Sequence, residues 1–259
     1  MPLYGQKRIM MNLHNFPVKK SVGLLLDPDK TERNALKRTL KIASESRTDY
    51  IFAGVSITFT SIDHLIRSVK EFCDIPIILF PGNLLQLSHE ADGILLLSLI
   101  SGRNPELLIG NHVLAAPYLK DIRKKLISTG YILINCGTKT SVEYMSQTEA
   151  IPYDKTDIVI ATALAGEMLG MKMIYLEAGS GAARPIPENM IRSVKENIKI
   201  PIAVGGGLRT GKEIKETYSA GADLIIIGNG VERDPNLLID ACKIRDSFKS
   251  LPPIPHGGT

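Results

Sequence analysis

The sequence predicts a single domain, residues 1–259, with the fold of a (β/α)8 TIM barrel. Two observations support this prediction. Eight short apolar runs are spread over most of the chain, and amphipathic helical patterns separate most of them. Polar and glycine-rich residues follow many of these runs, at the strand ends where the active sites of barrels lie. A doubly wound open sheet is the alternative, but no linker or shift in composition divides the chain.

Three apolar runs and the helical patterns between them predict the first part of the barrel. Leu36, Leu40 and Ala43 share one face of a helix that Thr31 is expected to cap. The next helix has nearly ideal spacing of its apolar residues. The predicted strands are Ser21–Asp27, Tyr50–Ser56 and Ile75–Phe80, and the second helix spans Ser61–Cys73.

The connection after the third strand is unusually short. Only the stretch PGNLLQLSHEAD separates Phe80 from the fourth predicted strand, Gly93–Ser98. A crossover between parallel strands usually needs a dozen residues or more. We therefore expect a modified barrel with a shortened connection at this point.

The second half of the chain continues the alternation of strands and helices. A helix near Leu119–Ile127 is expected within the long stretch Asn104–Thr129. The further strands are Tyr131–Asn135, Lys172–Glu177, Ile200–Val204 and Asp223–Ile227, and the further helices are Asp157–Leu169, Glu188–Ile198, Gly211–Ala220 and Pro235–Leu251.

The composition excludes several classes of protein. The net charge of +4 fits anionic small molecules or contact with a membrane surface, and is too weak to indicate nucleic-acid binding. The three cysteines and five histidines have no metal-binding spacing. No signal peptide or apolar run of membrane-spanning length is visible, so a soluble, cytoplasmic protein is expected.

Glycine-rich turns after the last strands predict a phosphate site. VGGGLRTGKEI (Val204–Ile214) and IIIGNG (Ile225–Gly230) each lead from a strand into a turn, and GSG follows the sixth strand. Glycine lets the backbone approach a ligand, and helix N-termini favour anions. In barrels, the loops after strands seven and eight are the usual phosphate site. Backbone donors, with Ser180 and Asn229, would hold the phosphate.

Paired aspartates follow the first strand. Asp27 and Asp29 flank a proline, and either could simply cap a helix. The functional interpretation is a Mg²⁺ site, since Mg²⁺ takes one or two carboxylates and leaves room for phosphate oxygens. Asp27 lies nearer the strand end, and Ser56 after the second strand could complete the site.

Glu177 and Tyr175 form the candidate catalytic pair. Side chains alternate along a strand, so both point to the same side. Beside a phosphate site, Glu177 is interpreted as a general base that deprotonates a hydroxyl which Tyr175 helps to hold. An ordinary ion pair at the barrel mouth is the alternative. Apolar residues near the mouth, such as Ile57, Phe59, Leu96 and Leu97, could belong to the core or to a lipid groove.

Four motifs together resemble the geranylgeranylglyceryl phosphate synthase / heptaprenylglyceryl phosphate synthase family. They are LDPDK (Leu26–Lys30), YLEAGSGA (Tyr175–Ala182), VGGGLRTG (Val204–Gly211) and IIIGNG. The resemblance covers the chain from about Ser21 to Phe248 and implies a modified barrel that lacks its third helix. It also implies a prenyltransferase that joins the 3-hydroxyl of sn-glycerol 1-phosphate to a prenyl diphosphate in ether phospholipid biosynthesis.

The resemblance implies a role for each matching residue. Asp27 and Ser56 would bind Mg²⁺, and Glu177 would act as the base. Many members carry a lysine where this chain has Leu25, which indicates the second group of the family, a geranylgeranyl (C20) donor and homo-oligomers, either dimers or hexamers. Glycerol phosphate would be held by Tyr175, Leu176, Glu177, Ala178, Gly179, Ser180, Gly181, Gly206, Gly207, Gly228 and Asn229.

Two other functions share the glycine loops. One is a phosphate-binding barrel isomerase or aldolase that acts on a small phosphorylated metabolite. No lysine ends an apolar strand, which counts against an aldolase Schiff base. The other is a barrel that only binds a phosphate ligand, and Glu177 together with Asp27 argues against it.

Overall fold

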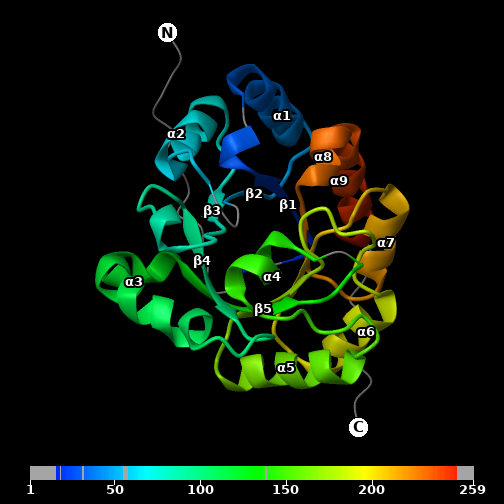
Figure 1. Cartoon of the computed structure of the whole chain (residues 1–259). Coiled ribbons are helices and arrows are strands. Elements are labelled where there is room, and N and C mark those ends of the chain that lie inside the picture. The colour runs from blue at the N-terminus through cyan, green and yellow to red at the C-terminus, as the bar shows by residue number, and fades with distance from the viewer. Residues whose placement is uncertain (1–15, 18, 31, 55–57, 138, 250–259) are drawn as a thin grey trace.

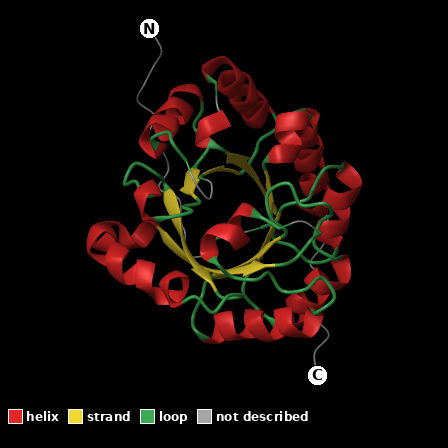
Figure 2. Ribbon diagram, in the orientation of Figure 1, coloured by secondary structure: helices red, strands yellow, loops and turns green. Residues whose placement is uncertain are grey.

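The fold is a closed barrel of eight parallel strands, which Figure 2 shows as a yellow ring inside a layer of red helices. The computed structural model describes residues 16–17, 19–30, 32–54, 58–137 and 139–249. The strands follow one another in chain order, and β1 closes the ring by pairing with both β2 and β8. The predicted fold is confirmed. The strands are β1 (Ser21–Leu26), β2 (Tyr50–Ala53), β3 (Ile77–Leu79), β4 (Gly93–Leu99), β5 (Leu126–Leu133), β6 (Met173–Glu177), β7 (Ile202–Gly205) and β8 (Leu224–Ile227).

Helices cover the outside of this barrel (Figure 1). Most of them present an apolar stripe to the sheet, as α2 does with Leu65, Ile66 and Val69. The helices are α1 (Arg33–Glu45), α2 (Ile62–Phe72), α3 (Asn111–Leu119), α4 (Ser141–Ser146), α5 (Thr156–Met168), α6 (Glu188–Asn197), α7 (Gly211–Ser219), α8 (Asn229–Arg233) and α9 (Asn236–Lys249).

Side-chain alternation along the strands separates two layers of core. In β6, Met173 and Tyr175 point into the barrel, while Ile174 and Leu176 pack outward against the helices. Phe16 also packs among the inward-facing side chains, with its ring 4.8 Å from that of Tyr50. The interior is therefore filled up to the level of Tyr175, and open space begins above it.

The ring of helices is interrupted after β3. Between β3 and β4 the chain forms only a short 3-10 helix, Leu84–Gln86. The shortened connection predicted from the sequence is thus confirmed. A full crossover helix would cover the outer side of β4. The short connection leaves this side, which lies next to α3, partly uncovered.

Local details differ from the expectation between β4 and α5. The helix predicted near Leu119–Ile127 is confirmed in part: Leu119 ends α3 and Lys120–Lys125 form a 3-10 helix, but Leu126 and Ile127 begin β5 and pair with Ile94 and Leu95 of β4. The helical segment begins earlier, as one π-helical turn, Glu106–Gly110, followed by α3. Helix α4, which lies over the barrel opening in Figure 1, was not predicted. Thr31, the expected cap of α1, lies outside the described residues.

Within the described part of the chain, no helix is both long and apolar enough to cross a membrane.

Candidate active site

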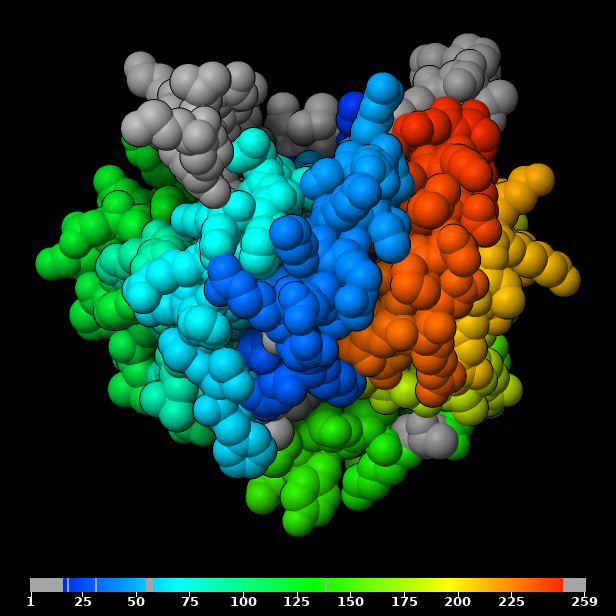
Figure 3. Space-filling model, turned by 90° about the horizontal axis from the view of Figure 1, so that it is seen from above, coloured from blue at the N-terminus to red at the C-terminus, as the bar shows by residue number. Residues whose placement is uncertain are grey.

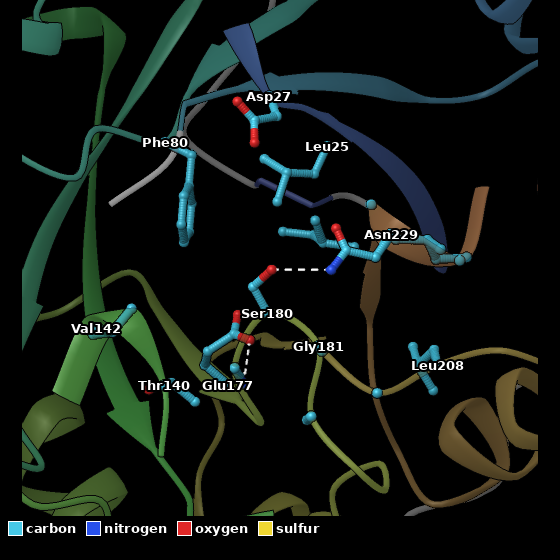
Figure 4. A pocket seen from close by; sticks show the side chains of 18 of the residues that line it. Leu25, Asp27, Phe80, Thr140, Val142, Glu177, Ser180, Gly181, Leu208 and Asn229 are labelled. Atoms are coloured by element: carbon cyan, nitrogen blue, oxygen red, sulfur yellow. Dashed lines mark hydrogen bonds between the residues drawn. The ribbon is translucent and has the colours of Figure 1, made fainter. Parts of the chain in front are cut away.

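A cavity of about 340 Å³ opens at the carboxyl ends of the strands. Its wall combines the glycine-rich turns after β6, β7 and β8 with Asp27 after β1. In Figure 4, Asp27, Glu177, Ser180 and Asn229 surround the same open space. The predicted convergence of the strand ends therefore produces one pocket rather than separate turns.

The turns after β6 and β7 pack closely against each other. Gly206 has φ +81°, and a Cβ placed there would lie 2.6 Å from Glu177 Oε1 and 2.8 Å from the Gly179 nitrogen. Gly207, at φ +72°, leaves similarly little room beside the Arg184 carbonyl. Only glycine combines this backbone conformation with so close an approach.

Polar side chains fix these turns at two points. The Asn229 amide donates to Ser180 Oγ at 3.0 Å, which links the turns after β8 and β6. The Arg209 guanidinium donates to the Ala182 carbonyl at 2.5 Å and to the Ala183 carbonyl at 3.3 Å. The backbone N–H groups of these turns, which could bind an anion, are thus held in position.

Glu177 lies buried at the floor of the cavity. Its Oε1 accepts a hydrogen bond from the Gly179 N–H at 2.6 Å. Burial raises the pKa of the Glu177 carboxyl above its usual value, and hydrogen bonds from the Tyr175 hydroxyl and the Gly179 N–H oppose this rise. A carboxylate with a raised pKa is a stronger base, which suits proton removal from a hydroxyl.

Tyr175 lies directly below Glu177 and is fully buried. Burial raises the pKa of its hydroxyl well above the usual range, and the nearby Glu177 carboxylate raises it further. The hydroxyl therefore stays protonated and can donate. Its ring packs edge-on against those of Phe80 and Tyr131, at centroid distances of 5.4 and 5.3 Å. These contacts fix the position of the hydroxyl.

The structure places the predicted substrate residues as follows. Leu176 and Ala178 are buried in the outer core, so only their backbone is near the site. The others line the cavity: Tyr175, Glu177, Gly179, Ser180, Gly181, Gly206, Gly207, Gly228 and Asn229.

The two aspartates after β1 have different surroundings. Asp29 accepts hydrogen bonds from the Thr58 hydroxyl and from the Phe59 and Thr60 N–H groups, so it holds the loop before α2. Asp27 lines the cavity. Ser56, the other predicted metal ligand, lies outside the described residues.

A lysine ammonium lies between two carboxylates at the cavity rim. Lys30 Nζ is 3.4 Å from Asp27 Oδ2 and 3.5 Å from Glu232 Oε2. No group of three or more His, Cys, Asp or Glu side chains suited to a metal occurs among the described residues. One or two carboxylates beside a phosphate site nevertheless fit Mg²⁺, which takes its other oxygens from water and substrate phosphates.

An apolar groove of about 300 Å³ adjoins the cavity. Phe80, Tyr131 and Val142 line both spaces. The groove runs between the short helix after β3 and α3, where the ring of helices is interrupted. Leu96 and Leu97, which the sequence left open between core and groove, are half-buried and line it. The other apolar lining residues include Leu84, Leu87, Leu95, Leu99, Leu107, Ala115, Leu119 and Met145.

Four charged residues that line the cavity had no role predicted from the sequence: Lys30, Arg209, Glu232 and Arg233. Two of them were visible inside recognised motifs, as the last residue of LDPDK and the arginine of GGGLRTG. Glu232 follows the GNG turn by two residues, and charge complementarity to Lys30 was the available signal. Their mutual contacts depend on the closure of β8 against β1, which no local pattern encodes.

Comparison with known proteins gives a consistent result. The model of the PcrB family matches residues 18–245. The geranylgeranylglyceryl phosphate synthase of Spirosoma linguale is 47% identical over 221 residues, covering 85% of this chain and 89% of that protein. The protein of the same name from Korarchaeum cryptofilum is 39% identical over 230 residues, covering 88% and 94%.

Solved structures are similar as well. The crystal structure of (S)-3-O-geranylgeranylglyceryl phosphate synthase from Thermoplasma acidophilum, in complex with its substrate sn-glycerol-1-phosphate, matches with a TM-score of 0.82 and 32% identity, covering 90% of this chain and 94% of that one. An N-acetylmannosamine-6-phosphate 2-epimerase from Clostridium perfringens matches with a TM-score of 0.55 and 14% identity, which reflects the barrel fold alone.

Proposed function

Because the chain belongs to the PcrB family, we propose that it is a geranylgeranylglyceryl phosphate synthase. It transfers a prenyl group from a prenyl diphosphate to the 3-hydroxyl of sn-glycerol 1-phosphate. The names of the relatives and the glycerol phosphate in the Thermoplasma acidophilum structure support both the reaction class and the acceptor. The alternative, an isomerase or aldolase, has no comparable support.

One observation carries the proposal: a polar cavity with phosphate-binding turns shares a wall with an apolar groove. The glycine turns suit the glycerol phosphate, and the groove suits the prenyl tail. Phe80, Tyr131 and Val142 form the boundary, so the reacting ends of both substrates would meet beside Glu177. An enzyme that acts on a small phosphorylated metabolite needs no such groove.

Glu177 and Tyr175 would carry out the proton transfer. The acceptor hydroxyl donates to the Glu177 carboxylate, while the Gly179 N–H and the Tyr175 hydroxyl hold that carboxylate in place. As the hydroxyl oxygen forms its bond to C1 of the prenyl group, the C–O bond to diphosphate breaks. The proton passes to Glu177, and diphosphate leaves with the bonding electrons. The apolar wall keeps water away from the electron-poor carbon.

Mg²⁺ is the proposed cofactor. Asp27 would hold it, with Ser56 as the second protein ligand, and the ion would neutralise charge on the leaving diphosphate. The ammonium of Lys30 beside Asp27 and Glu232 supports a cation at this rim. Lys30 is one of the cations in the cavity wall that could turn to the diphosphate.

The donor is proposed to be geranylgeranyl diphosphate, and the protein is proposed to form homo-oligomers. The names of the relatives support the C20 chain. Leu25, in place of the lysine typical of the other group, supports both points through the family resemblance.

The test incubates the protein with Mg²⁺, labelled sn-glycerol 1-phosphate and prenyl diphosphates of several lengths. An ether product with the C20 donor as the preferred substrate is expected. If no donor gives an ether product, the proposal is wrong, and a product only with the C35 donor would overturn the chain length alone. Light scattering of the same preparation measures the oligomeric state.

A further inference from the structure

Helix α3 and the π-helical turn before it, Glu106–Gly110, are apolar on their outward side as well as their inward side. Four outward side chains are largely exposed: Ile109 (60%), Val113 (63%), Leu114 (67%) and Tyr118 (50%). We call these four residues the α3 outer face. The green atoms at the left edge of the space-filling view come from this part of the chain (Figure 3). A helix that is apolar all round is normally buried on all sides, so the outer face indicates a contact with another apolar phase.

A basic segment follows directly after α3. Lys120, Arg123 and Lys124 are exposed, and no ion pair with any described residue is found for them. Lys125 differs, because its ammonium donates to the His89 and Ala91 carbonyls. Asp121 is the single acid among these residues. Each Lys or Arg near an anionic bilayer contributes about 1 kcal/mol of attraction.

The inward side of the same helix lines the apolar groove. Leu107, His112, Ala115 and Leu119 face the groove, so one helix thickness separates it from the outer face. On the opposite wall, the short helix after β3 exposes Leu85 to 93%. Exposed apolar side chains therefore flank the groove on both sides.

We propose that the α3 outer face and the basic segment dock the protein on an anionic lipid bilayer. Tyr118 suits the interface, because its ring is apolar and its hydroxyl polar. The further step, that a lipid-soluble donor enters the groove from this bilayer, rests on the proposed function. Docking itself does not depend on that function.

Charge favours a bilayer over a second copy of the chain. A twofold contact through the α3 outer face would bring the same surface of two protomers together, and with it Lys120, Arg123 and Lys124, which form no ion pair with a described residue. Like charges in an interface are unfavourable. An anionic surface pairs with the same three cations and accepts the apolar side chains.

The test is sedimentation of the full chain with lipid vesicles. Wild type is expected to bind vesicles that contain phosphatidylglycerol, and to bind pure phosphatidylcholine vesicles or vesicles in high salt at least about tenfold more weakly. The double variant Val113→Glu/Leu114→Glu and the triple variant Lys120→Gln/Arg123→Gln/Lys124→Gln should each weaken binding by a similar factor. All these positions are exposed, so folding should be retained.

The control variant is Met168→Glu/Leu169→Glu on the outer side of α5, where both side chains are similarly exposed. It should bind vesicles like wild type. The proposal is overturned if wild type does not bind the vesicles, or if the control variant loses as much vesicle binding as Val113→Glu/Leu114→Glu does. The proposal is also overturned if Val113→Glu/Leu114→Glu dissociates an oligomer while vesicle binding stays intact. The α3 outer face would then be a contact between copies of the chain.

A second measurement separates docking from catalysis. The variants should retain the wild-type rate of prenyl transfer with a detergent-solubilised donor. With a donor embedded in anionic vesicles, their rate should fall several-fold below that of wild type. If wild type transfers no prenyl group from either the detergent-solubilised or the vesicle-embedded donor, the proposed function is wrong. The docking proposal is then still tested by the vesicle-binding measurement. Equal transfer by variant and wild type from vesicles would refute entry of the donor from the bilayer.

Discussion

Gly206 lies so close to Glu177 that no side chain could stand between them: a Cβ on Gly206 would be 2.6 Å from Glu177 Oε1. The turn after β7 thus covers the carboxylate that β6 presents. Burial at this place raises the pKa of the Glu177 carboxyl. The phosphate turn and the proposed base are therefore parts of one packed unit.

Gly206→Ala should abolish most activity, because the new methyl group displaces the carboxylate or the Gly179 N–H. Gly170→Ala is the matched control, since Gly170 has the same φ of +81° and a Cβ there meets nothing within 4 Å. Both variants should lose roughly 1 kcal/mol of stability to backbone strain. Steady-state kinetics and chemical denaturation compare them. Equal activity of the two variants would show that the contact with Glu177 is unimportant.

Glu177→Gln should lower kcat by about 10²- to 10⁴-fold if the carboxylate is the base. The amide oxygen can still accept the Gly179 hydrogen bond, so glycerol phosphate should bind nearly as well as before. Calorimetric titration measures that binding. Loss of binding in proportion to loss of rate would assign Glu177 to substrate binding instead.

The same variant should change the pH dependence of stability in a defined direction. The pKa of Glu177 is raised in the folded state above its usual 4.5, so folding disfavours its ionised form. At pH below 4.5, wild type and Glu177→Gln should respond alike to pH. As the pH rises through the window between 4.5 and the raised pKa, wild type should lose stability relative to the variant, and the difference should then level off. Urea denaturation over a pH series measures it, and a difference independent of pH would contradict the raised pKa.

Tyr175→Phe should move the acid limb of kcat/KM to higher pH. The hydroxyl of Tyr175 lowers the pKa of Glu177 by hydrogen bonding, and its removal lets the pKa rise further. At neutral pH the rate should fall about tenfold or more. The full pH–rate profile is the measurement. A lower rate with an unmoved acid limb would mean that Tyr175 acts on the substrate alone.

Asp27→Asn should raise the Mg²⁺ concentration needed for half-maximal activity by about tenfold or more, because one charged ligand is lost. Mg²⁺ binding is also read out without turnover, as protection against thermal unfolding. Asp29→Asn is the control, since Asp29 is occupied by Thr58 and the loop before α2. Identical Mg²⁺ titrations for wild type and Asp27→Asn would exclude Asp27 as a ligand.

The strands could be predicted from sequence because parallel barrel strands are buried on both faces and read as continuous apolar runs. The glycine turns were equally visible. The helix near Leu119–Ile127 was predicted to run two residues too far, because Leu119, Ile122 and Leu126 have helical spacing, yet pairing with β4 draws Leu126 into a strand. One missed element had a signal: Thr140 and Glu143 form a capping box at the start of α4.

The groove and the charge cluster at the rim could not be predicted in the same way. Leu96 and Leu97 look identical in sequence whether they face a helix or an open groove. Their exposure depends on what the short connection after β3 leaves uncovered. Lys30 and Glu232 meet only because the sheet closes on itself.

Because no full helix follows β3, the proposed sites for catalysis and for the prenyl tail lie on different elements of the fold. Chemistry is fixed by strand ends and glycine turns, where Gly206 tolerates no side chain. The apolar groove proposed for the prenyl tail lies beside the cavity, between α3 and the short helix Leu84–Gln86. Substitutions on those two elements can lengthen or shorten that space without moving Glu177. The length of the proposed donor can thus be changed at the periphery of the fold, with the proposed catalytic residues left as they are.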